Sequence, residues 1–168
     1  QDDAGAAGAR GALVHRLLQS LADIAPERRA AAAQAFLQRA APGVAEPEAI
    51  VVECLAVLDA PALAPFFGPR SRAEAALAAR VARADRPPVD IVGRLDRLVE
   101  RDREIWIADF KTGAPALRPP HVAQMALYRA GLAQIYPGRA VRAFLVYTRT
   151  ARAQELTAAQ MDAALAAL

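Results

Sequence analysis

The sequence has 168 residues, 55% of them apolar, which suits one compact domain with a substantial buried core. Its net charge is only +3 although its pI is near 9.6, so a nucleic-acid partner is permitted but not required. The single cysteine, Cys54, excludes an internal disulfide and a zinc or iron–sulfur site built from cysteines, and it fits a reducing, cytoplasmic setting.

No apolar run approaches the roughly 20 residues of a membrane span, so we expect no membrane partner. Because the sequence begins at Gln1 without a methionine, we expect a fragment of a larger protein.

The first 70 residues are predicted to be helical. Residues 1–9 read as a loose lead-in, and residues 61–71 read as a connector because they are rich in proline and glycine. Between these segments, apolar spacing and proline starts predict helices over residues 11–22, 26–39 and 47–59.

The pattern changes to strands after residue 71. Strands are predicted over residues 74–83, 89–99, 104–110 and 141–147, with a helix over 121–136 and a last helix capped by Thr157. The first three strands can pair as an antiparallel meander, whereas the fourth follows a helical crossover and can lie parallel to a neighbour. We therefore expect an α/β fold, in which a mixed β-sheet core with flanking helices (71–168) packs with the N-terminal helical part (1–70) as one compact domain.

Lys111 is the only lysine among 21 basic residues, the others being arginines. A lysine is a compact, tunable charge, whereas an arginine is a planar fork, so the two are not interchangeable chemically. A lysine retained at a single position therefore marks a candidate functional residue.

Asp109-Phe110-Lys111 is the strongest chemical signal. Asp109 and Lys111 are two residues apart on a predicted strand, so their side chains leave the same face as the apolar Ile105 and Ile107. A hairpin turning near Asp102 can bring Asp96 beside Asp109. Two adjacent carboxylates make an oxygen site for Mg²⁺ or Mn²⁺, and such an ion with a nearby lysine suits phosphodiester hydrolysis. The plainer alternative is a cross-strand salt bridge with no catalytic role.

A wider set of motifs resembles a known family. The segments are Gly93-Arg94-Leu95-Asp96-Arg97-Leu98, Ile107-Ala108-Asp109-Phe110-Lys111-Thr112-Gly113, Gln124-Met125-Ala126-Leu127-Tyr128-Arg129 and Phe144-Leu145-Val146-Tyr147-Thr148. Over about residues 71–150 they resemble the RecB-like branch of the PD-(D/E)XK nuclease superfamily, and within it the C-terminal nuclease domains of AddA-type helicase–nucleases. The related AddB-type nucleases carry an iron–sulfur cluster on cysteines, so a single cysteine favours the AddA type.

The resemblance implies a role for each residue of the motif. Asp96 and Asp109 would be metal ligands, with the backbone carbonyl of Phe110 and the side chain of His15 completing the shell around Mg²⁺ or Mn²⁺. Lys111 would be the catalytic lysine. From the residues alone, a histidine beside the apolar stripe of the first helix is more often a surface or stripe-edge residue.

The resemblance also implies that Gln124 and Tyr128, which share a helix face, point toward the active site or DNA. The alternative is that Tyr128 packs into the core with Gln124 at its edge. Glu74 is either a third acid near the metal or a solvated strand end, and His121 is expected on the surface.

The function implied by the resemblance is an exonuclease that cuts single-stranded DNA during double-strand break repair by recombination. The expected partners are DNA, a helicase part in the same polypeptide and an AddB-like subunit. The alternatives are a catalytically inactive DNA-binding or scaffolding domain of the same fold, and a structural module of a helicase complex.

Overall fold

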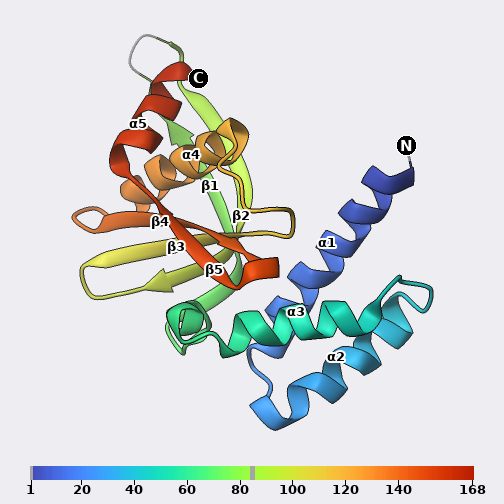
Figure 1. The fold of residues 1–168 in the computed structure, drawn as a ribbon. Coiled ribbons are helices and arrows are strands. Elements are labelled where there is room, and N and C mark those ends of the chain that lie inside the picture. The colour runs from blue at the N-terminus through green and yellow to red at the C-terminus, as the bar shows by residue number, and fades with distance from the viewer. Residues whose placement is uncertain (1, 84–85) are drawn as a thin grey trace.

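The computed structural model describes residues 2–83 and 86–168, and in them three α-helices precede a five-stranded sheet that carries two further α-helices (Figure 1). The elements in chain order are α1 (Asp2–Leu21), α2 (Pro26–Ala40), α3 (Pro47–Asp59), the 3₁₀ helix η1 (Pro61–Phe67), β1 (Ser71–Val81), β2 (Val89–Glu100), β3 (Glu104–Lys111), α4 (Pro119–Ile135), β4 (Ala140–Tyr147), the 3₁₀ turn η2 (Thr148–Thr150), β5 (Arg152–Leu156) and α5 (Ala158–Ala167). This order confirms the predicted α/β class with its N-terminal helical segment.

The sheet has the strand order β1-β2-β3-β4-β5. Neighbouring strands pair antiparallel except β3 and β4, which are parallel and joined through α4. The predicted meander and the predicted parallel fourth strand are therefore both confirmed.

Three predictions about local structure are wrong. The lead-in predicted over residues 1–9 is helical over residues 2–9, because α1 begins at Asp2, and residue 1 lies outside the described residues. The strong helix propensity of the alanines outweighs the cost of two glycines. The connector over 61–71 contains η1, and β1 begins at Ser71. The strand β5 was missed because four of its five residues are exposed and show no apolar alternation. Its charged side chains suit the edge of a sheet.

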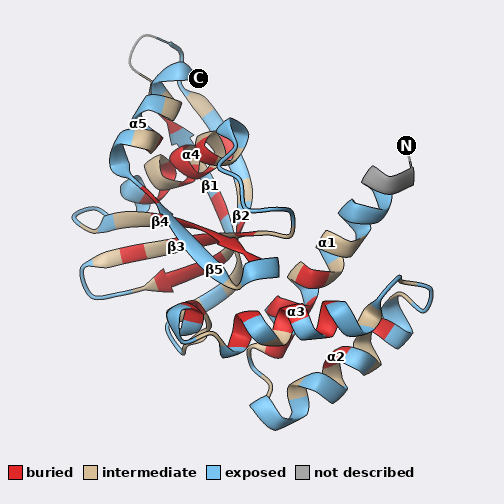
Figure 2. Ribbon diagram, in the orientation of Figure 1, coloured by how far each residue is buried: buried red, intermediate tan, exposed pale blue. Residues whose placement is uncertain are grey.

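Helices cover both faces of the sheet, and each face has its own core (Figure 2). On one face, Leu17 of α1 and Ile50 of α3 pack in the same cluster as Phe110 and Phe144. On the other face, Met125 of α4 and Met161 of α5 pack with Ile105, Ile107 and Leu145. Strand β3 is thus buried on both sides and alternates between them, which holds its C-terminal end in a defined orientation.

Cys54 lies in the core on α3 and is fully buried. Burial and the neighbouring Glu53 raise the pKa of its thiol to about 12, so at pH 8 the reactive thiolate is suppressed in the folded state. We expect a thiol reagent such as DTNB to leave the native protein unlabelled and to label it once it is unfolded in guanidinium chloride. Rapid labelling of the native protein would contradict this burial.

Among the described residues, no single helix is long and apolar enough to span a membrane. Helices α3 and η1 together have the length and apolar composition of a membrane span, but they are bent by 87° where they join.

Candidate active site

The candidate site lies where the regular backbone pairing of β2 with β1 is interrupted and its pairing with β3 ends. The β2–β3 ladder ends at Arg97↔Ala108, one step before Asp96 and Asp109 would pair. At this point Asp96 Oδ2 accepts a hydrogen bond of 2.6 Å from the backbone N–H of Phe110. On the other side of β2, regular pairing is interrupted opposite Asp96 by Glu74, whose φ is 51°. The Asp96 carboxylate thus accepts the hydrogen bond of the Phe110 N–H, which has no backbone acceptor on β2 because the ladder has ended.

His15 reaches the site from α1. Its Nδ1 lies 3.1 Å from Asp96 Oδ1, and its ring meets the Phe110 ring edge-on with the centroids 5.7 Å apart. Burial lowers the pKa of His15, but the hydrogen bond and charge of Asp96, the charge of Asp109 and the Phe110 backbone together raise it above the ordinary value. The imidazole therefore contacts Asp96 and lies within the influence of the Asp109 charge, and its role as a metal ligand stays a prediction.

Asp109 and Lys111 form a close, largely buried ion pair. Lys111 Nζ lies 2.5 Å from Asp109 Oδ2, and the two side chains are 20% and 13% exposed. Burial and the charge of Asp96 raise the pKa of Asp109 above its usual range, although Lys111 and His15 oppose this shift. Asp109 Oδ2 is buried and receives no hydrogen bond of good geometry from the described residues. The close polar partner of this oxygen among the described residues is therefore the Lys111 ammonium.

A buried polar network, which the sequence did not reveal, links the elements that carry the site residues. Arg10 of α1 donates to Glu53 Oε2 at 2.6 Å, and the Thr148 hydroxyl donates to Glu53 Oε1 at 2.5 Å. The same hydroxyl lies 3.3 Å from the backbone carbonyl of Lys111. This network ties α1, which carries His15, to the end of β3. The available signal was Glu53 itself, since it is the carboxylate in the middle of the otherwise apolar helix α3.

Gln124 and Tyr128 lie together on α4, as their spacing predicted. The Gln124 amide donates to the Tyr128 hydroxyl at 3.2 Å, and Tyr128 is buried in the core beneath α4. No hydrogen bond or ion pair joins either side chain to Asp109 or Lys111 within the part of the chain that the structure describes. Their place in the structure is thus the one expected for core packing, and their proposed role toward the substrate stays a prediction.

Two other candidate residues flank the centre. Glu74 Oε2 lies 3.7 Å from Arg94, and its charge also acts on the neighbouring Arg97. His121 stands in the first turn of α4, where slight burial and the charge of Lys111 lower its pKa. The Lys111 ammonium thus influences His121 across the loop that leads into α4.

Gly93 allows the close approach of Tyr128 to β2. A Cβ at this position would lie 2.3 Å from the Tyr128 hydroxyl oxygen and 2.8 Å from the ring carbon that carries it. We expect Gly93→Ala to lower the free energy of unfolding by about 1–3 kcal/mol, measured by urea denaturation, because Tyr128 must leave its position in the core. In a Tyr128→Ala background the same substitution should cost much less. Equal costs in the two backgrounds would show that Tyr128 does not fill this space.

Comparison with known proteins assigns the chain to a family. The sequence model of the PD-(D/E)XK nuclease superfamily matches residues 1–167. This chain belongs to the PD-(D/E)XK nuclease superfamily. A solved structure titled "Crystal structure of SSO0001" is 20% identical over 90% of this chain and 71% of that chain, with a TM-score of 0.38. No match was found among the curated proteins.

The motif that names the PD-(D/E)XK superfamily ends in an acid, any residue and a lysine, and Asp109-Phe110-Lys111 has this form. Asp96 stands where the earlier aspartate of the motif is expected, although Leu95 precedes it in place of proline.

The donor chemistry at this point fits a divalent cation. Two carboxylates and an imidazole are donor types that divalent cations accept, and His15 contacts Asp96 while the charge of Asp109 also acts on it. In the described part of the chain, no three carboxylate, imidazole or thiol side chains are grouped closely enough to hold a metal ion as they stand, so the fit concerns the types of donor and not their present arrangement.

Proposed function

We propose that this chain is a divalent-metal-dependent deoxyribonuclease domain that hydrolyses phosphodiester bonds of single-stranded DNA. The observation that carries the proposal is the buried Asp109–Lys111 pair beside Asp96 and His15, in a chain of the PD-(D/E)XK nuclease superfamily.

Each side chain has a task in this reaction. Asp96, Asp109, His15 and the Phe110 carbonyl would hold Mg²⁺ or Mn²⁺. The bound ion would supply Lewis acidity toward the phosphoryl oxygens and a lower pKa for the attacking water. The Lys111 ammonium would bind the phosphate and stabilise the negative charge that develops on it in the transition state. The network through Glu53 keeps His15 and Lys111 in place, so these residues need little rearrangement when substrate binds.

We further propose that the domain works as the exonuclease part of an AddA-like helicase–nuclease in recombinational repair of double-strand breaks in the cytoplasm. The helicase part would feed it a single strand, and an AddB-like subunit would be the partner. The support is the resemblance of the motif segments over about residues 71–150, together with the absence of cysteines for an iron–sulfur cluster.

The experiment measures Mg²⁺-dependent cutting of end-labelled single-stranded DNA by the wild type, Asp109→Ala and Lys111→Ala. We expect both substitutions to abolish cutting while circular dichroism shows an unchanged fold. Asp59→Ala is the matched control, because Asp59 is an exposed aspartate of α3 that pairs with Arg29, and neither residue belongs to the motif segments.

Two outcomes would contradict the proposal. Near wild-type cutting by either motif variant would remove the assigned residues from the reaction. DNA binding without any Mg²⁺- or Mn²⁺-dependent cutting by the wild type would instead favour an inactive DNA-binding or scaffolding domain.

A further inference from the structure

A second charged site lies at the other end of the sheet from the Asp109–Lys111 pair. A hollow of about 520 Å³ opens where β1 begins, where β2 turns into β3, and where α4 leads into β4. Its polar lining consists of Arg70, Arg72, Arg101, Arg139, Glu100 and Asp102. With four arginines against two carboxylates, the hollow carries an excess of positive charge.

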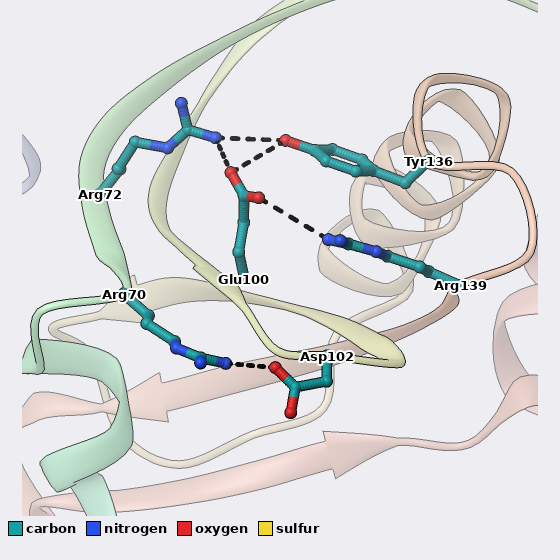
Figure 3. A network of polar contacts seen from close by, with 6 residues as sticks. All are labelled: Arg70, Arg72, Glu100, Asp102, Tyr136 and Arg139. Atoms are coloured by element: carbon teal, nitrogen blue, oxygen red, sulfur yellow. Dashed lines mark hydrogen bonds and ion pairs between the residues drawn. The ribbon is translucent and has the colours of Figure 1, made fainter.

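The carboxylates orient the arginines without satisfying them (Figure 3). Asp102 accepts from Arg70 at 2.6 Å, and Glu100 lies between Arg72 and Arg139. The Arg70 and Arg72 side chains are 65% and 60% exposed, so most of their donors remain open to a ligand. Arg139 Nη1 is buried, lies 3.6 Å from Glu100 Oε2 and has no hydrogen-bond partner among the described residues. Fixed guanidinium forks with free donors are suited to the oxygen atoms of a phosphate.

An aromatic ring stands beside these cations. The Tyr136 hydroxyl lies 3.2 Å from Arg72 and 3.4 Å from Glu100, and the Arg139 guanidinium lies 5.6 Å from the Tyr136 ring centroid (Figure 3). The ring is partly buried against the core beneath α4 and Arg139 lies over it, so its part is to hold the arginines in place. The positive charge of the hollow and its continuity with the face that carries Asp109 and Lys111 favour a nucleic-acid strand over an acidic peptide.

Arg72 and Glu100 of the hollow lie on the same face of the sheet as the Asp109–Lys111 pair, whereas the Arg101 guanidinium lies 4.4 Å from the ring centroid of Trp106, which packs with the core of the opposite face. Arg72 is paired with Leu98, which packs beneath α4, and Ile105 and Ile107 on this face precede Asp109 in the alternation of β3. The two sites are separated by the length of β3, about 23 Å at roughly 3.3 Å per residue. A single strand spans about 3.4 Å per nucleotide when it is stacked as in a duplex and up to about twice that when it is stretched, so roughly four to seven nucleotides would span this distance.

We propose that the hollow formed by Arg70, Arg72 and Arg139 binds a phosphate of a nucleic-acid strand about four to seven nucleotides from the scissile bond. The location relative to the scissile bond rests on the proposed nuclease function, whereas the binding of the strand does not. The site would hold the strand by its backbone, independently of base sequence.

The test measures binding of fluorescent dT₁₂ to the wild type and to the double variant Arg70→Gln/Arg72→Gln in EDTA, so that no cutting occurs, over a series of salt concentrations. Each phosphate contact contributes about 0.7 to the slope of log K against log salt for single strands, so losing one or two contacts should lower the slope by about 0.7–1.4. We expect the affinity at low salt to fall about tenfold.

Two matched variants separate this site from general surface charge. Arg80→Gln removes an equally exposed arginine that pairs with Asp90 across β1 and β2, and it should leave the affinity and the slope unchanged. Asp102→Asn removes a negative charge from the hollow and should tighten binding. Competition arms with inorganic phosphate and polyglutamate identify the ligand: phosphate should compete only weakly, at high concentration, and polyglutamate should not compete.

The inference is overturned if the double variant matches the wild type in affinity and slope, or if it changes no more than Arg80→Gln. Displacement of dT₁₂ by polyglutamate as effectively as by DNA would overturn it in favour of an acidic protein partner. Failure of the nuclease proposal is seen separately, because it appears in the cutting of DNA by the motif variants and not in this binding measurement.

Discussion

Replacing Lys111 by arginine is expected to slow Mg²⁺-dependent cutting of single-stranded DNA by about a hundredfold or more, nearly as much as replacing it by alanine. Loss of one group that stabilises charge in a transition state costs about 10²–10³ in rate. Arginine keeps the charge, but its planar fork is wider than the ammonium and delocalises that charge. The Lys111 side chain is only 20% exposed and lies 2.5 Å from Asp109, so this position offers little room for the larger group. Single-turnover cutting of an end-labelled strand measures the effect.

The reverse exchange supplies the control. Arg149→Lys alters an exposed arginine in η2 and should leave the cutting rate within a factor of about two. Equal melting temperatures for Lys111→Arg and the wild type would separate a chemical defect from unfolding. A Lys111→Arg enzyme that cuts within about fivefold of the wild-type rate would contradict this prediction, because loss of transition-state stabilisation should reduce the rate far more. It would mean that position 111 needs only a positive charge.

Replacing Glu53 by alanine is expected to lower the free energy of unfolding by about 3 kcal/mol, because removing one partner of a buried ion pair leaves the other charge uncompensated. The Glu53 side chain is 6% exposed and accepts from both Arg10 and Thr148, so two donors lose their acceptor. Urea denaturation of the whole chain measures the change. Cutting should also weaken, since the positions of His15 and Lys111 depend on this network.

The matched control for Glu53 is Asp59→Ala, also on α3. Asp59 pairs with Arg29 but its side chain is 63% exposed, so its loss should cost less than about 1 kcal/mol. Glu53→Gln keeps the shape and an acceptor, and its cost should fall between the two. If Glu53→Ala were no more destabilising than Asp59→Ala, the network would contribute nothing to holding α1 against the sheet.

The fold was predictable to the extent that burial leaves a periodic pattern in the sequence. The apolar stripe of α1 and the two-sided apolar strand β2 follow directly from spacing, and the crossover through α4 made a parallel β3–β4 pair foreseeable. Strand β5 left no such pattern, because an edge strand with exposed side chains is held mainly by its main-chain bonds to β4. Residues 5–9 of α1 are similarly exposed, so the helix there leaves no apolar stripe in the sequence.

The site was predictable where residues are close in sequence and not where distant segments meet. Asp109 and Lys111 are two residues apart on one strand, so their pairing follows from strand geometry. The contact of His15 with Asp96 joins segments 81 residues apart and came only from resemblance to a family. Glu53 and Thr148 are 95 residues apart, and no local pattern indicated that they meet.

The bond from the Phe110 amide to Asp96 has a practical consequence for choosing an inactive variant. Asp96 serves as a candidate ligand and also as the acceptor that secures β3 where its ladder with β2 stops. A substitution of Asp96 removes the candidate metal ligand and the hydrogen-bond acceptor together. A loss of cutting could then arise from a displaced end of β3 as readily as from the loss of a ligand. Asp109 accepts no main-chain hydrogen bond in the described part of the chain, so a catalytically silent protein for trapping uncut DNA is better made at that residue.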